Sequence, residues 1–256
     1  YWGIDSPHAI SSATLSKVEP FNTGYSAGLI MTFSGFPEAP GFELCLTANL
    51  IGNEIVFELA ATELWTELRA VNWPKAIELG NTEADLAVIP RMQGVLLPGN
   101  WPQRVDAEDL CNSRSFYMPW WGQIHDGHGV QVILETSDDA GGAYHHPEGG
   151  PTRIAPRWYA SLGRLGYLRT VRYVFDDNAT YVTMAKRYRR FVQERGHLVT
   201  LREKLVRTPA LAEVIGRPVV HLGALYHFVS QASLFNKERI EANHALRTFD
   251  QLADDL

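Results

Sequence analysis

Apolar and polar residues alternate with a period of two along most of the chain as far as Phe175, a pattern that predicts β-strands. The predicted strands are 27–34, 42–50, 53–60, 68–72, 76–79, 130–136, 157–163 and 166–175, with two shorter apolar runs in 84–98. Segments 42–50 and 53–60 are so close that we expect a hairpin. Pro90 separates the two runs of 84–98, which places them at a sheet edge or a bend. The pattern predicts a mainly β domain.

Two segments lack this alternation and are expected to be loops. Residues 141–156 contain His145-His146, two Gly-Gly pairs and three prolines, and residues 99–115 are mostly polar. Glycine and proline in such numbers are typical of irregular backbone. We therefore expect a long surface loop at 141–156, of a length that is often functional.

The central stretch, 116–142, holds the first candidate ligand site. It opens with Trp120-Trp121, continues into the polar turn 125–129, and then enters the half-buried strand 130–136. Neighbouring residues of a strand point to opposite faces, so we expect one tryptophan in the core and the other exposed. An exposed ring beside His125 and Asp126 suits a sugar, whose C–H face stacks on an aromatic ring while its hydroxyls take polar partners. The alternative is that both rings serve a β-sandwich as core and rim.

The period changes to that of a helix after Phe175. Residues 180–194 form an amphipathic helix, which Asp177 or Asn178 would cap and Gly196 would end. The basic residues at 186–190 are expected on its solvated face. A second helical piece at 201–215 is interrupted by Pro209. An apolar strand at 218–228 and a helix at 238–256 follow, which together predict a βα unit.

Composition narrows the functional classes. The chain has 256 residues, of which 45% are hydrophobic and 20% are charged, so a sizeable core is expected. The formal net charge of -6 argues against nucleic-acid binding. No apolar run approaches the ~20 residues of a membrane span. Cys45 and Cys111 are too few for a disulfide scaffold. Neither an initiator methionine nor an export signal is visible, so the sequence leaves a bacterial cytoplasmic or a secreted location open.

Seven segments, among them VILETSDDA (132–140) and TLREKL (200–205), occur in an order similar to that of a group of bacterial glycoside hydrolases. The other five are IPRMQGVLLP (89–98), FYMPWWG (116–122), LGYLRTVRYVF (165–175), YVTMAKRYRRFVQERG (181–196) and VVHLGALYHF (219–228). Over 26–256 the chain resembles the endo-α-N-acetylgalactosaminidase families and their relatives, in which a galactose-mutarotase-like β-supersandwich precedes a (β/α)8 catalytic barrel. The resemblance implies a supersandwich at 1–177, a helical linker at 178–216, and the first βα unit of the barrel at 217–256.

The resemblance also implies a carbohydrate ligand and an incomplete active site. In such barrels the catalytic carboxylates follow later strands, so we expect them beyond Leu256, joined to this part by the rest of the barrel domain. Tyr226 and His227, at the end of the first barrel strand, would face the active-site mouth and bind sugar hydroxyls. The alternative is that both are satisfied inside a domain interface.

Two other functions stay open at this point. The chain could be a non-catalytic carbohydrate-binding or scaffold module that uses Trp120 or Trp121. It could also be a mutarotase-like sugar epimerase in which His128 and Glu135 transfer protons. The cluster of His125, Asp126 and His128 is ordinary turn chemistry rather than a metal site, so no metal and no cofactor is predicted.

Overall fold

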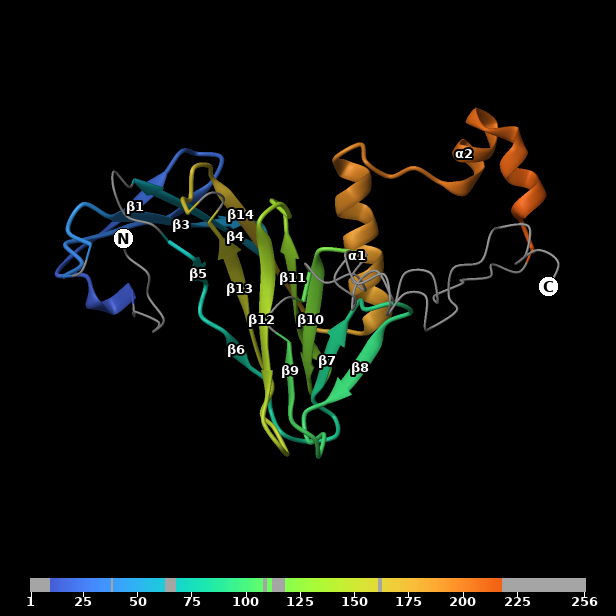
Figure 1. Ribbon diagram of the computed structural model, residues 1–256, viewed down its shortest axis with the longest axis horizontal. Coiled ribbons are helices and arrows are strands. Elements are labelled where there is room, and N and C mark those ends of the chain that lie inside the picture. The colour runs from blue at the N-terminus through green and yellow to red at the C-terminus, as the bar shows by residue number, and fades with distance from the viewer. Residues whose placement is uncertain are drawn as a thin grey trace, which may run out of the picture. The chain divides into compact units, whose positions relative to one another are not determined.

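The computed structural model describes residues 10–37, 39–62, 68–107, 110–111, 118–160 and 163–217. The chain divides into two units, Tyr1–Leu198 and Val199–Leu256. In the first unit, two antiparallel sheets form two layers (Figure 1). The prediction of a mainly β chain with a few helices is confirmed.

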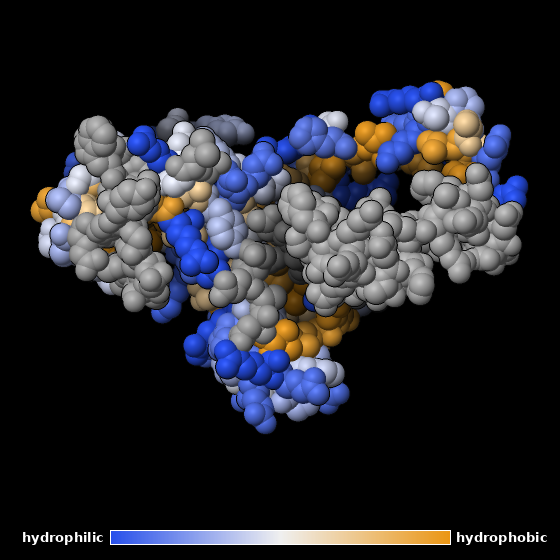
Figure 2. All heavy atoms as spheres, viewed as in Figure 1, coloured by the Kyte–Doolittle hydropathy of each residue, from blue (hydrophilic) through white to orange (hydrophobic). Residues whose placement is uncertain are grey.

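The larger sheet has nine strands in the order β1-β2-β3-β4-β14-β11-β10-β7-β8. Their bounds are β1 Leu15–Asn22, β2 Ala27–Ser34, β3 Glu43–Ile51, β4 Glu54–Thr62, β7 Leu86–Ile89, β8 Val95–Pro98, β10 Trp120–His125, β11 His128–Leu134 and β14 Arg169–Asp176. The short 3₁₀ turn η1, Ile10–Ser12, precedes β1. β3 and β4 form the expected hairpin, and β8 is the expected edge strand. Exposed apolar residues lie over β8 (Figure 2).

The smaller sheet has the order β5-β13-β12-β9, with β6 also paired to β13. Its strands are β5 Ala70–Asn72, β6 Ile77–Glu78, β9 Val105–Ala107, β12 Ala140–His146 and β13 Arg153–Tyr159. The expected loop at 141–156 is therefore wrong, because β12 and β13 occupy most of it. Gly142 packs against Leu110, and Tyr144 and Ile154 enter the core. Tertiary packing of small and aromatic residues has overridden the weak strand propensity of the local sequence.

The main core lies between the two sheets. Trp121, Val132 and Leu134 of the larger sheet belong to one apolar cluster with Tyr144, Ile154 and Trp158 of the smaller sheet. Inward-facing residues of each strand alternate with outward-facing ones, as in other β-sandwiches. The period-two pattern places Val132 and Leu134 on one face of β11, and both belong to this core.

Helix α1, Tyr181–Glu194, covers part of the outer face of the larger sheet (Figure 1). Met184 and Phe191 form a second apolar cluster with Trp120, Ile133 and Val174. The Gln131 side chain crosses the same interface, and its Nε2 donates to the Met184 carbonyl at 2.9 Å. β11 is consequently buried on both faces, and the expectation of a half-buried strand is wrong.

Two glycines bring α1 close to the sheet. A Cβ at Gly122 would collide with the Met184 side chain, and a Cβ at Gly129 would collide with Ala179. At the helix start, Thr180 and Thr183 form a reciprocal capping box, so the cap is Thr180 rather than Asp177 or Asn178. Gly196 ends the helix as predicted, with a φ of 71° that suits glycine.

The second unit contains helix α2, Leu201–Arg207, and the 3₁₀ helix η2, Pro209–Val214. A capping box of Thr200 and Glu203 starts α2, and Pro209 interrupts the helical segment where the sequence predicts. No helix in the described residues is long and apolar enough to cross a membrane. The βα unit expected at 217–256 falls almost wholly outside the described residues, as do Tyr226 and His227. The boundaries at 177 and 216 stay predictions.

Candidate functional site

The two adjacent tryptophans are both buried. Trp120 is 3% exposed and Trp121 is 0% exposed. They point to opposite faces of β10 as expected, but α1 covers the outer one, and the Trp120 ring stacks on Tyr188 with centroids 6.1 Å apart. The expectation of one exposed ring is therefore wrong, because the outer face of this strand is a second core. Neither indole offers a platform for a sugar.

His125, by contrast, is exposed and held in place. It ends β10, its side chain is 70% exposed, and its Nδ1 pairs with Asp85 Oδ1. Asp85 is only 1% exposed. Its Oδ2 accepts from the Thr82 backbone N–H at 2.8 Å and from the Thr82 hydroxyl at 2.6 Å. The carboxylate therefore orients the imidazole, and Nε2 is the ring nitrogen left for a ligand.

Each member of the His125–Asp85 pair favours the charged form of the other. The hydrogen bond and the charge of Asp85 raise the pKa of His125. Burial opposes ionisation of Asp85, but its bonds to Thr82 and His125 outweigh that effect and lower the pKa of the carboxyl. The pair therefore favours the protonated imidazole, whose outward Nε2–H would suit a sugar hydroxyl or a carboxylate. Asp126, at the exposed turn of the β10–β11 hairpin with a φ of 47°, adds a further negative charge near His125.

Sequence reasoning found His125 but missed Asp85 and Thr82. A threonine three residues before an aspartate, as in Thr82-Glu83-Ala84-Asp85, is a local signal that the two side chains can bond across a turn. The pairing with His125 joins positions 40 residues apart through the β7–β10 contact. That contact depends on strand order, which a single sequence does not state.

His128 and Glu135 do not form an acid–base pair. They lie seven residues apart at the two ends of β11, which at ~3.3 Å per residue is about 23 Å. His128 lies 3.4 Å from Asp177, and Glu135 is buried in ion pairs with arginines. The mutarotase-like assignment of these two residues is therefore wrong. Among the described residues, no group of three histidine, cysteine, aspartate or glutamate side chains is placed to hold a metal.

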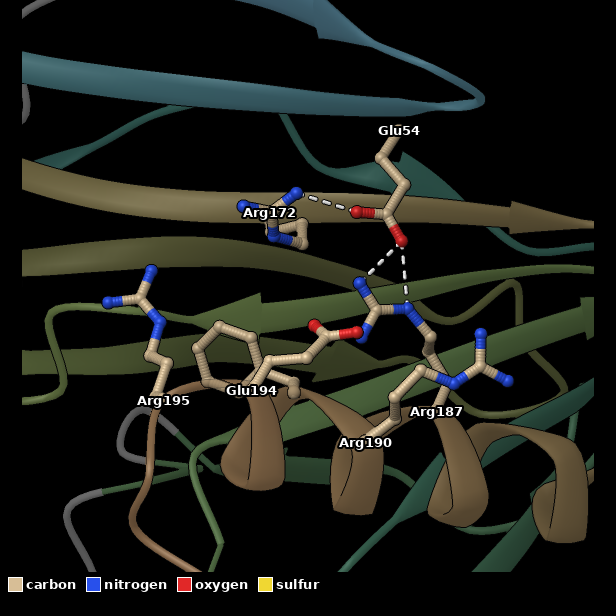
Figure 3. Close-up of a pocket in the computed structure, with 7 residues that line it drawn as sticks. Glu54, Arg172, Arg187, Arg190, Glu194 and Arg195 are labelled. Carbon is tan, nitrogen blue, oxygen red and sulfur yellow. Dashed lines mark hydrogen bonds and ion pairs between the residues drawn. The ribbon is translucent and has the colours of Figure 1, made fainter.

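A network of ion pairs joins α1 to the larger sheet (Figure 3). Arg172 of β14 donates to Glu54 and to Glu135, at 2.6 Å in each case. Glu54 also accepts from Arg187 of α1, and Glu135 accepts from Arg195 at the end of the helix. Burial disfavours a charged guanidinium, but the two carboxylates outweigh it and raise the pKa of Arg172.

The network surrounds a polar cavity of about 320 Å³. Arg190, Phe191 and Glu194 complete its lining (Figure 3). The ion pairs around this cavity link α1 to β4, to β14 and to the end of β11 in the larger sheet. Arg187 is thus part of a buried network and not of the solvated face expected from the sequence.

Solved structures of one glycoside hydrolase are similar to this chain. The α-N-acetylgalactosaminidase NagBb from Bifidobacterium bifidum, in its complex with Gal-NHAc-DNJ, is 31% identical with a TM-score of 0.77, over 85% of this chain and 36% of that enzyme. Its complex with GalNAc gives 32% identity and a TM-score of 0.75, over 84% and 36%. The ligand-free enzyme gives 30% and 0.71, over 81% and 35%. The chain therefore matches a region of a bacterial glycoside hydrolase and spans about a third of it.

Two further comparisons add little about function. The large ribosomal subunit protein bL17 of Sorangium cellulosum (strain So ce56) is 36% identical over 112 residues, which are 43% of this chain and 59% of that protein. No protein-family model matches the chain.

Proposed function

We propose that this chain is the β-sandwich part of a glycoside hydrolase that cleaves terminal α-linked N-acetylgalactosamine from glycans. The observation that carries the proposal is the similarity to NagBb over more than four fifths of the chain, in fold and in sequence together. The order of segments that resembles the endo-α-N-acetylgalactosaminidase families supports the same class. In this proposal the sandwich is of the galactose-mutarotase type.

The catalytic carboxylates are assigned to a part of the enzyme other than the described sandwich. Glycoside hydrolysis normally needs two carboxyl groups flanking one sugar-binding position. The most buried carboxylates here are already committed: Glu54 and Glu135 to arginines, and Asp85 to His125. A carboxylate bonded to cationic side chains within the fold is not free to flank a sugar. We assign the carboxylates to a (β/α)8 barrel that begins near residue 217, with Tyr226 and His227 at its mouth.

Hydrolysis of p-nitrophenyl α-N-acetylgalactosaminide tests this proposal. The product of the whole gene and the 256-residue chain are assayed side by side, with the β-anomer and the α-galactoside as controls. Release of nitrophenol from the α-N-acetylgalactosaminide by the whole product alone is the expected result. Turnover by the short chain would overturn the assignment of catalysis to a barrel. If the whole product releases no nitrophenol, the alternative of a carbohydrate-binding or scaffold module is favoured.

The similarity to bL17 does not favour a ribosomal role. Binding to ribosomal RNA requires a surplus of basic residues facing the phosphates. This chain has 29 acidic and 23 lysine or arginine residues, a formal net charge of -6. The balance of charge therefore opposes RNA binding.

A further inference from the structure

Trp101 is an exposed tryptophan at the same end of the larger sheet as His125. It follows β8 and is 39% exposed. Its backbone N–H donates to the Pro98 carbonyl at 3.1 Å, which closes a tight turn after the strand. Part of its indole is therefore open to solvent, in contrast to the buried rings of Trp120 and Trp121.

The strand ladder brings this turn close to His125. β8 and β10 both pair with β7, one on each side, and at the end of the ladder Gly99 and His125 lie in one row with Asp85 between them. The Gly99 N–H donates to the Asp85 carbonyl at 2.6 Å, and the Asp85 carboxylate pairs with His125. Neighbouring strands are about 4.8 Å apart, so Gly99 and His125 are about 10 Å apart. Trp101 follows Gly99 by two residues, which brings its indole and the imidazole within the length of a short oligosaccharide.

Buried groups hold the Trp101 turn in place. The Trp101 carbonyl accepts from His146 Nε2 at 2.8 Å and from the Gly149 N–H at 3.1 Å. His146 is fully buried, and its Nδ1 is 2.8 Å from the Thr152 hydroxyl. Because a carbonyl oxygen only accepts, Nε2 carries a proton, and the imidazole is held from both sides. The exposed indole is thus attached to a fixed part of the fold.

Three glycines let the segments at this end pack closely together. A Cβ at Gly80 would collide with the Asp85 carboxylate, and a Cβ at Gly99 would collide with the Gly80 carbonyl. A Cβ at Gly150 would collide with the Gly99 carbonyl. The segments that carry Asp85 and Trp101 therefore approach each other more closely than larger residues would permit. Binding groups on such a support lose little freedom when a ligand binds.

Trp101 and His125 supply the two kinds of contact that a sugar makes. The C–H face of a sugar ring stacks on an aromatic ring, while its hydroxyls take polar partners. His125 is bonded through Nδ1, which leaves Nε2 of an exposed side chain for a ligand. A hydroxyl both donates and accepts, so it can bond Nε2 whether or not that nitrogen carries a proton.

We propose that Trp101 and His125 form a surface binding site for neutral rings of a glycan, with one ring stacked on the indole and a hydroxyl bonded to the imidazole. The choice of a sugar rests on the proposed function, whereas the pairing of an exposed ring with an anchored imidazole rests on the geometry. Asp85 is a positioning residue, because it acts through His125. The site holds the glycan and takes no part in bond cleavage.

An NMR titration of the 256-residue chain tests this inference. The probe is a disaccharide of α-N-acetylgalactosamine linked to galactose, and the signals followed are the His125 ring protons and the Trp101 indole N–H. Both signals should shift with one shared dissociation constant, because one ligand contacts both side chains. A shift at only one of the two residues would overturn the joint site, and no shift at either would overturn the binding.

Variants of the tryptophan test the stacking. Trp101→Ala should weaken binding of the disaccharide about tenfold, and Trp101→Phe should restore most of the affinity, since a phenyl ring still stacks. Tyr25→Ala is the matched control, because it removes another exposed aromatic ring, in the turn between β1 and β2. It should bind as the parent does. Parental affinity in Trp101→Ala would overturn the site.

Variants of the histidine test the hydrogen bond. His125→Ala should weaken binding about fivefold, and His125→Gln should restore part of the affinity through its amide group. His197→Ala, which removes an exposed histidine after α1, is the matched control. Asp85→Asn should weaken binding in the parent but cause no further loss in His125→Ala. A further loss there would overturn the positioning role of Asp85, and parental affinity in His125→Ala would overturn the site.

The binding test and the test of function fail separately, because the titration measures no turnover. If the whole gene product cleaves the α-N-acetylgalactosaminide while the disaccharide shifts neither Trp101 nor His125, the site is wrong and the proposed function stands. If the disaccharide binds while no glycoside is cleaved, the site stands and the proposed function is wrong.

Discussion

The outer faces of the two sheets differ in how they are covered. On the larger sheet, α1 covers Trp120, Ile133 and Val174 and is tied down by the ion pairs around Arg172. On the smaller sheet, the corresponding face carries a groove floored by alanines and flanked by arginines. Strands of similar pattern therefore build a second core in one place and a groove in the other.

The arginines of the two faces also have different partners. Arg172 and Arg187 both donate to the carboxylate of Glu54, which holds the two side chains together within the fold. Arg157 of the smaller sheet donates to an amide oxygen, that of Asn72. Small residues differ in the same way. Gly122 and Gly129 admit a helix, whereas Ala143 and Ala155 leave space.

The largest expected effect is that of removing Arg172. Arg172→Met would leave Glu54 and Glu135 mostly buried with part of their compensating charge gone, which typically costs about 3–5 kcal/mol in free energy of unfolding. Urea unfolding followed by circular dichroism measures it. Arg189→Ala on the exposed side of α1 is the control and should change that free energy by no more than about 0.5 kcal/mol. Similar losses for the two variants would remove the distinction between buried and exposed arginines.

Filling the space beneath α1 should have the next largest effect. Gly129→Ala places a methyl group against Ala179 and should lower the free energy of unfolding by about 1–3 kcal/mol. Gly166→Ala is the matched control, because a Cβ there meets nothing and the backbone is not in the left-handed region. A parental urea midpoint for Gly129→Ala would show that the helix is not closely seated on the sheet.

The strands and the helix were largely readable from the sequence, because each carries its own period. The bounds of β2 match the prediction, and α1 differs from it by one residue. The wrong predictions concern features that depend on contacts between residues distant in the sequence. Residues 141–156 were expected to be a loop because their local composition hides a strand pair stabilised by the core. The exposure of Trp120 depended on where α1 docks, and a single sequence does not state that.

The contribution of the His125–Asp85 pair to the stability of the fold should depend on pH. The folded chain favours charged His125, so its stabilisation is present below the ordinary pKa of 6.5 and lost as pH rises through the raised folded value. The Asp85 contribution is present above 3.8 and lost as pH falls through its lowered folded value. The pair is therefore strongest between the two folded pKa values.

A titration of the His125 ring by NMR measures the first of these pKa values. Asp85→Asn should lower the pKa of His125, because it removes the hydrogen-bonded carboxylate. Asp126→Asn, which removes only a minor contribution, should lower it less. An unchanged pKa in Asp85→Asn would show that the carboxylate does not set the charge of the histidine.

The smallest expected effect on stability is that of a substitution on the outer face of the smaller sheet. Ala143→Leu adds bulk to the groove floor rather than to a packed interface, so its free energy of unfolding should stay within about 0.5 kcal/mol of the parent. Urea unfolding alongside Gly129→Ala makes the contrast direct. A loss as large as that of Gly129→Ala would mean that the floor is packed against other residues, and the difference between the faces would disappear.

The adjacent tryptophans limit which changes of sequence strand β10 can accept during evolution. Trp120 opposes Ile133 in the outer core, and Trp121 opposes Val132 between the sheets. Deleting one residue from β10 would send each ring to the wrong side, because side chains alternate along a strand. Descendants can therefore exchange residues here far more readily than they can change the length of the segment. Insertions and deletions should instead accumulate at the exposed turn of Asp126 and Gly127, two residues that belong to neither core.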